Sequence, residues 1–201
     1  GWTYPNEYLR SLYDKDKDKR LQFYFYPDTL YGNNPASVYY EKKLPGDPPY
    51  STQLRQYTWS LMKYRDLSKP AKRALSYKPF IAYRLADTYI LGAEAHWRKG
   101  NTEKALEYLN AIRLRAGLEE ATTIDLQTIM DEYARELCFE GKRWFFLKRI
   151  GKLVEQVNKY HRFGSTTSSI QGTTMKDYMV RWPIPQAQID AMGTFPQNPQ
   201  Y

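Results

Sequence analysis

Two consecutive stretches with the spacing of amphipathic helices limit the fold of this chain more than any other feature. In FIAYRLADTYILGAEAHWRKG, residues 80–100, apolar or small residues recur every three or four positions. This predicted helix face consists of Ile81, Leu85, Tyr89, Gly92, Ala93, His96 and Trp97. Gly100 and Asn101 end the first helix. Thr102 is the expected N-cap of a second helix, which closes at Gly117.

The helix pair is similar to one tetratricopeptide unit, in which small residues let two helices approach closely. The match is partial, since glycine stands where a large apolar residue is usual, and the positions that carry the likeness are Tyr89, Gly92, Ala93, His96, Ala105, Leu109 and Ile112. No second copy follows at the period of 34 residues that defines this repeat. Because a single unit cannot bury its own apolar face, we expect the pair to pack on the rest of this chain or on sequence outside it.

A third helix is predicted at about 125–140, with three glutamates at intervals of four, Glu132, Glu136 and Glu140. Such a row could ligate metal, but di-iron bundles need Glu-x-x-His pairs, and neither histidine lies three residues after a glutamate. We therefore predict ion pairs with Arg135, Arg143 and nearby bases, and no metal site.

The following stretch EGKRWFFLKRIG, residues 140–151, combines bases and aromatic residues. If a helix begins near Lys142, one side carries Trp144, Phe145, Leu147 and Ile150, while Lys142, Arg149 and Lys152 point outward. A membrane-surface helix or a nucleic-acid surface remains an alternative, but a membrane-surface helix needs a longer and more sharply divided pattern. We predict a helix that packs against the protein itself.

The first 79 residues differ in composition from the rest of the chain. They are rich in Tyr, Pro, Gly and Asn, which indicates long loops with a few short strands. The aromatic run LQFYFYP, residues 21–27, is predicted as a strand. The expected fold is thus mainly α-helical, with one tetratricopeptide-like helix pair. We expect two regions, a loop-rich segment at 1–79 and a helical region at 80–201, together forming one compact unit.

Charge and reactive residues narrow the possible functions. The net charge of +8 comes from 30 bases and 22 acids. Bases and acids are interleaved, as in DKDKDKR, residues 14–20, and this pattern is typical of a solvated surface. No nucleic-acid motif accompanies this charge, so we expect no nucleic-acid partner. One cysteine, two histidines and no GxSxG, HExxH or phosphate-loop motif leave no candidate catalytic residue and no cofactor. A carboxylate pair for glycoside hydrolysis stays open, because only its spacing in the fold defines it.

Three ordered blocks resemble the C-terminal region of the SusD/RagB family of outer-membrane lipoproteins from Bacteroidetes. They are YRLADTYILGAEAHWRKGNTEKALEYLNAIRLRAGL, then IMDEYARELCFEGKRWFFLKRIG, and RWPIPQAQIDAMGTFPQNPQY. The resemblance covers residues 80–201, with KYRDLS (63–68) as a fainter extension. Two residues depart from the family pattern, Phe146 where an acid is usual and Gln200 where glycine is usual.

This resemblance implies a non-enzymatic lipoprotein that captures nutrients, most often oligosaccharides, on the extracellular face of the outer membrane. It also implies a SusC-like TonB-dependent transporter as partner. Because family members are more than twice this length, we expect a C-terminal fragment whose N-terminal half and lipid anchor lie outside this chain. A peptide-binding RagB-like protein, a helical protein-protein scaffold and, less favoured, a glycoside-active enzyme stay open as alternatives.

Aromatic residues in the first third are the candidate ligand-binding residues. Tyrosine and tryptophan offer a flat apolar face beside a polar tip, which suits the C–H patches and hydroxyls of sugars. The candidates are Tyr31, Asn33, Asn34, Tyr39, Tyr40, Tyr50 and Trp59. Many of these rings could equally belong to the core, since aromatic residues dominate core area.

Overall fold

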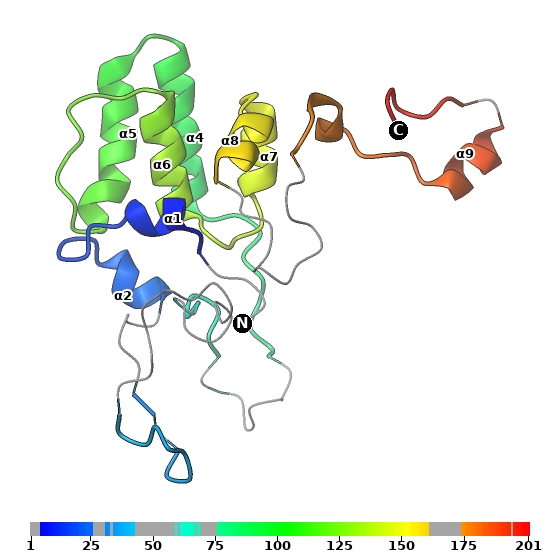
Figure 1. Ribbon diagram of the computed structural model, residues 1–201. Coiled ribbons are helices and arrows are strands. Elements are labelled where there is room, and N and C mark those ends of the chain that lie inside the picture. Colours follow the sequence, from blue (N-terminus) through cyan, green and yellow to red (C-terminus); the bar gives the residue numbers. More distant parts are fainter. Residues whose placement is uncertain are drawn as a thin grey trace. The chain divides into compact units, whose positions relative to one another are not determined.

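The computed structural model describes residues 5–25, 31–32, 34–42, 59, 61–66, 68, 76–160, 174–193 and 195–201, and these are mainly helical (Figure 1). The elements are α1 (Glu7–Ser11), α2 (Arg20–Tyr24), α4 (Leu85–Arg98), α5 (Thr102–Arg115), α6 (Leu126–Glu136), α7 (Arg143–Arg149), α8 (Leu153–Tyr160), the 3-10 helix η1 (Asp177–Val180) and α9 (Gln186–Met192). Extended pairing within the described part of the chain is limited to isolated bridges. The mainly α-helical fold class is confirmed.

The predicted helix pair is formed by α4 and α5, which lie side by side in Figure 1. Asn101 caps α5 through its side chain, which accepts a hydrogen bond from the Lys104 N–H, so Thr102 is the first helical residue and not the cap. A side chain at Gly92 would come within 2.8 Å of the Tyr108 ring. Gly92 therefore permits a close approach of the two helices, at a position where the tetratricopeptide pattern usually has a large apolar residue.

The buried side of α4 differs from the predicted face. Ile90 and Ala93 are completely buried, whereas Leu85 is exposed at the first turn of the helix. The apolar spacing had placed Leu85 on the core side because it cannot locate the start of the helix. That start is set by Asp87, whose carboxylate accepts a hydrogen bond from the Arg84 N–H at 3.0 Å.

The third helix, α6, contacts both α4 and α5 and starts where its cap places it. The Asp125 side chain accepts hydrogen bonds from the N–H and hydroxyl of Thr128 at 2.7 and 2.6 Å. Ile129 and Leu137 are buried, one in the helix and one directly after it. Because α6 ends at Glu136, the third glutamate of the row follows the helix.

The run LQFYFYP is not a strand over its described residues. Residues 20–24 form α2, and only Phe25 is extended, in an isolated bridge to Leu61. Phe25 then packs in a small core cluster of Tyr13, Phe25, Trp59 and Cys138. The aromatic content that suggested a strand instead supplies this cluster, because packing outweighs local strand propensity.

The chain divides into two compact units, the first extending to Arg143 and the second beginning at Trp144. In the second unit, the Asn158 side chain bonds both the N–H and the carbonyl of Met175 at 2.8 and 2.9 Å. Pro185 lies in an extended conformation directly before α9. The division at residue 79 rests on a change in amino-acid composition and stays a prediction.

The stretch EGKRWFFLKRIG forms α7, one residue later than expected. Phe146 and Leu147 are buried, at 4% and 6% exposure, while Phe145 is 71% exposed. Phe145 was thus wrongly placed on the packed side. Lys142 does not point outward either, because its ammonium group lies 2.8 Å from both carboxylate oxygens of Asp87. No helix in the described ranges has the length and apolar character to cross a membrane.

Candidate functional site

Residues 31–32 and 34–42 form a compact pair of segments that we call the tyrosine clasp. The Gly32 N–H donates to the Lys42 carbonyl at 3.0 Å, and the Gly32 carbonyl accepts from the Glu41 N–H at 2.9 Å. Both backbone groups of one glycine are therefore satisfied by the opposite segment. This pairing joins the two ends of the clasp.

Local hydrogen bonds shape the turn inside the clasp. The Asn34 side chain accepts from the Ala36 N–H at 3.0 Å, and the Asn34 carbonyl accepts from the Ser37 N–H at 2.9 Å. The Ser37 carbonyl then accepts from the Tyr40 N–H at 2.9 Å. Asparagine and serine favour such turns because their short side chains bond nearby backbone groups. Asn34 thus helps to build the turn in addition to lying exposed.

The clasp presents its rings to solvent. Tyr31 is 63% exposed, Tyr39 is 42% exposed and Tyr40 is 41% exposed. These values leave ring area on each tyrosine accessible while the backbone beneath is hydrogen bonded. Four of the seven candidate residues, these three and Asn34, therefore occur together on one exposed element.

The other candidates divide into two groups. Trp59 is 8% exposed, and its ring lies 5.5 Å from that of Phe25 and 6.3 Å from that of Tyr13. The Trp59 ring therefore belongs to the core cluster, which corrects the prediction that this residue contacts a ligand. Asn33 and Tyr50 lie outside the described residues.

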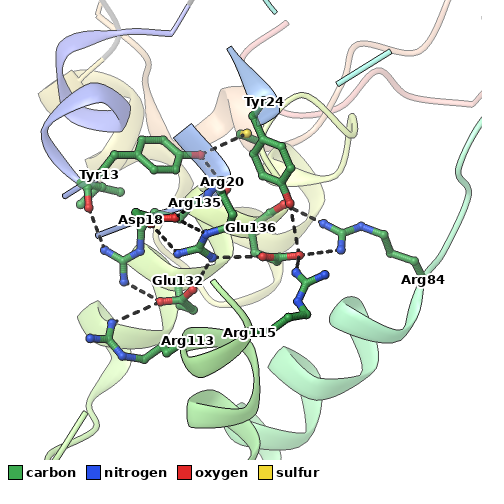
Figure 2. Close-up of polar contacts among 12 residues, drawn as sticks. Tyr13, Asp18, Arg20, Tyr24, Arg84, Arg113, Arg115, Glu132, Arg135 and Glu136 are labelled. Carbon is green, nitrogen blue, oxygen red and sulfur yellow. Dashed lines mark hydrogen bonds and ion pairs between the residues drawn. The ribbon is translucent and has the colours of Figure 1, made fainter. Parts of the chain in front are cut away.

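The buried charges of the first unit hold the N-terminal segment on the helices (Figure 2). Arg20 donates through Nε and Nη2 to the two oxygens of Asp18, at 2.9 and 2.8 Å. Its Nη1 donates to Glu132 at 2.6 Å and to Glu136 at 3.0 Å. One guanidinium group from α2 thereby bridges two successive turns of α6. All four of these side chains are buried.

Further cations complete the charge balance around the glutamates. Glu132 also pairs with Arg135 and Arg113, at 2.6 and 3.4 Å. Glu136 pairs with Arg84 at 2.6 Å and with Arg115. Each of these two carboxylates thus has three arginine partners, which offsets the cost of removing it from water.

Glu140 fixes the entry to α4. Arg84 donates to it through Nε and Nη2, at 3.0 and 2.8 Å, and Lys63 lies 2.5 Å away. Lys63 also donates to the Glu136 carbonyl at 2.8 Å. The row of glutamates therefore binds α2, α4, α5 and the segment around residue 63 to one helix. Ion pairing was predicted correctly, although Arg143 is seen donating to the Met130 carbonyl.

The electrostatics of this network stabilise the charged forms. Burial acts to raise the pKa of Glu136, but Arg84, Arg115 and Arg20 outweigh it and lower the pKa to about 2. Burial likewise opposes the lowered pKa of Glu132, which Arg20 and Arg135 produce. These carboxylates are ionised structural groups at neutral pH and are poor proton donors.

Cys138 and the glutamate row have surroundings that favour structural roles. Cys138 is buried, and burial raises the pKa of its thiol, which disfavours the nucleophilic thiolate. Across the part of the chain that the structure describes, no three His, Cys, Asp or Glu side chains are grouped so that they could hold a metal ion. The glutamate row offers its oxygens to arginine and lysine side chains.

Sequence reasoning missed the burial of Asp18 and Arg20, which belong to the run read as a solvated surface. Alternating signs over residues 14–20 gave no sign that two of them face the protein. The available signal was the row of three glutamates predicted for the third helix, because buried carboxylates need cations, which other parts of the chain can supply.

The described residues thus form a mainly helical structure with a tetratricopeptide-like pair and an exposed turn that carries three tyrosines. A model of the SusD family matches residues 2–201, and the chain belongs to that family. The starch-binding protein SusD of Bacteroides thetaiotaomicron is 33% identical over 140 residues, which are 69% of this chain and 24% of that protein. The chain thus spans about a quarter of the length of this relative.

Solved structures agree on the fold. A SusD superfamily protein from Parabacteroides distasonis has a TM-score of 0.69 at 21% identity, covering 98% of this chain and 42% of that one. Surface glycan-binding protein A from Bacteroides uniformis has a TM-score of 0.63 at 22% identity, covering 94% of this chain and 39% of that one. At these identities the likeness shows a shared fold.

Proposed function

We propose that this protein binds oligosaccharides at the cell surface and does so without catalysis, with the tyrosine clasp contributing to the binding face. The observation that carries the proposal is membership of the SusD family together with identity to a starch-binding relative. The exposed rings of the clasp add a chemical reason. Sugar C–H groups pack on aromatic faces, while hydroxyl groups bond to nearby polar tips.

The proposal includes a place in nutrient uptake. A SusC-like TonB-dependent transporter on the outer membrane is the proposed partner, with the protein held at the extracellular face by a lipid anchor outside this chain. The N-terminal half of the longer protein is proposed to pack on this region. This part of the proposal is supported by the partial coverage of the starch-binding relative, of which the chain covers 24%.

Binding is expected to be modest. A few ring faces contacting a flexible, well-hydrated ligand give a dissociation constant between about micromolar and millimolar, or about 4 to 8 kcal/mol. Titration calorimetry against starch oligosaccharides such as maltoheptaose, β-glucan oligosaccharides and short peptides tests the substrate class. Product analysis on the same samples tests for hydrolysis.

The double substitution Tyr39→Ala with Tyr40→Ala locates the site. It should weaken oligosaccharide binding by about tenfold or more, equivalent to about 1.4 kcal/mol. The melting temperature should hardly change, because exposed rings contribute little to the core and surface substitutions stay within about 0.5 kcal/mol. Both quantities are measured on the same preparations.

Tyr77→Ala is the matched control, because Tyr77 is an exposed tyrosine outside the clasp. This variant should bind as the unchanged protein does. Normal binding by the double variant would move the oligosaccharide site away from the clasp. Binding of peptides alone, or release of sugar products, would replace the proposed function with a peptide-binding or an enzymatic one.

A further inference from the structure

The clasp closes at its glycine with no room for a side chain. A Cβ built on Gly32 would lie 2.0 Å from the Tyr39 carbonyl oxygen and 2.6 Å from the Tyr39 carbonyl carbon. Those atoms are backbone, so no side-chain rotation could relieve the overlap. Gly32 is required for this close approach. It is not required for an unusual backbone angle, because its φ is not positive.

A second observation shows that the opposite segment is held in place. Glu41 has a φ of 57°, the left-handed region that non-glycine residues rarely adopt. Its N–H donates to the Gly32 carbonyl, and the next N–H, that of Lys42, donates to the Tyr39 carbonyl at 3.0 Å. Such a conformation persists where surrounding contacts define it. The strain at Glu41 is therefore offset by the bonds made at Gly32.

The consequence concerns the rings on both segments. Tyr31 directly precedes Gly32, and Gly32 is paired in a bridge with Tyr40. We infer that Gly32 is a positioning residue: its missing side chain lets residues 39–42 close against it and sets Tyr31, Tyr39 and Tyr40 as one binding face. The role in binding rests on the proposed function, whereas the positioning of the rings does not.

Gly32→Ala tests this inference while leaving every tyrosine in place. Relieving the overlap requires residues 39–42 to move by about 1 Å or more, which breaks both hydrogen bonds made by Gly32. Affinity for maltoheptaose should fall about tenfold, because displaced rings no longer contact one ligand together. Amide hydrogen exchange at Gly32 and Glu41 should accelerate in the same variant.

The control is Gly100→Ala, the same chemical change at the turn between α4 and α5. A Cβ at Gly100 meets nothing within 4 Å, but its φ of 76° makes alanine strained there. This variant should lose stability and keep the oligosaccharide affinity of the unchanged protein, with the same exchange rates at the Gly32 and Glu41 amides. A loss of binding in Gly32→Ala but not in Gly100→Ala thus reports ring position and not general destabilisation.

The possible outcomes separate the inference from the proposed function. If Gly32→Ala binds within twofold of the unchanged protein while the Tyr39 and Tyr40 double variant does not, the positioning role is wrong and the site stands. If the unchanged protein binds no oligosaccharide, the proposed function fails, and amide exchange decides the positioning role. Unchanged exchange at Gly32 and Glu41 in Gly32→Ala would overturn that role.

Discussion

Replacing Arg20 by methionine removes the cation at the centre of the buried network while keeping a side chain of similar length. Asp18, which is buried, loses the partner that contacts both of its oxygens. Removing one partner of a buried ion pair costs about 3 to 5 kcal/mol, because the remaining charge stays out of water. Since small domains are stable by about 5 to 15 kcal/mol, Arg20→Met should remove a large fraction of the total.

The structure supplies a comparison within the same network. Arg115 pairs with Glu136 too, but its side chain is 58% exposed, and that carboxylate keeps Arg20 and Arg84. Arg115→Met should therefore cost about 1 kcal/mol or less. Adding Asp18→Asn to Arg20→Met should recover part of the loss, because the orphaned charge is then gone.

Urea unfolding at pH 7, followed by far-ultraviolet circular dichroism, measures all of these variants. The slope of free energy against urea should stay the same, so that midpoint shifts report stability. A loss below about 1 kcal/mol for Arg20→Met, or a loss no larger than that of Arg115→Met, would refute the view that burial makes this cation essential.

Two further outcomes are expected. Because the folded pKa of Glu136 is about 2, against an ordinary value of 4.5, the stability from its ionisation is present above about pH 4.5 and is lost as pH falls toward 2. The urea midpoint should fall over that window, less steeply in Glu136→Gln, and a flat profile would contradict the assignment. Phe146→Ala should lower the free energy of unfolding by about 3 to 5 kcal/mol, because Phe146 is buried. Phe145→Ala, at the exposed neighbouring position, should lower it by about 0.5 kcal/mol or less, and urea unfolding measures both.

The helices were the most predictable part of the chain. The spacing of Leu109 and Ile112 follows directly from helix geometry, and both are buried as expected. Helix ends were less certain, because Asn101 and Thr102 are both good capping residues and only the hydrogen bond to Lys104 decides between them. Periodicity alone also did not separate Phe145 from Phe146, because both lie in one apolar run and only packing decides which of the two faces the core.

Contacts between distant parts of the sequence could not be predicted. The row of glutamates predicted ion pairs, but nothing local assigned Arg20 to Glu132 and Glu136. For the proposed binding surface, aromatic composition suggested Tyr39 and Tyr40 together with Trp59, and only burial separates Trp59 from the two tyrosines. Composition reports which rings could bind, while the fold decides which are exposed.

The bonds from Arg20 to α6 also have a consequence for the order of folding. They join positions separated by 112 and 116 residues, whereas α4, α5 and α6 follow one another closely. Local contacts form early because they close short loops, and contacts across long loops form late. The three-helix part should therefore form the nucleus, with the N-terminal segment docking afterwards. Weakening the Arg20 contacts would then accelerate unfolding far more than it slows folding.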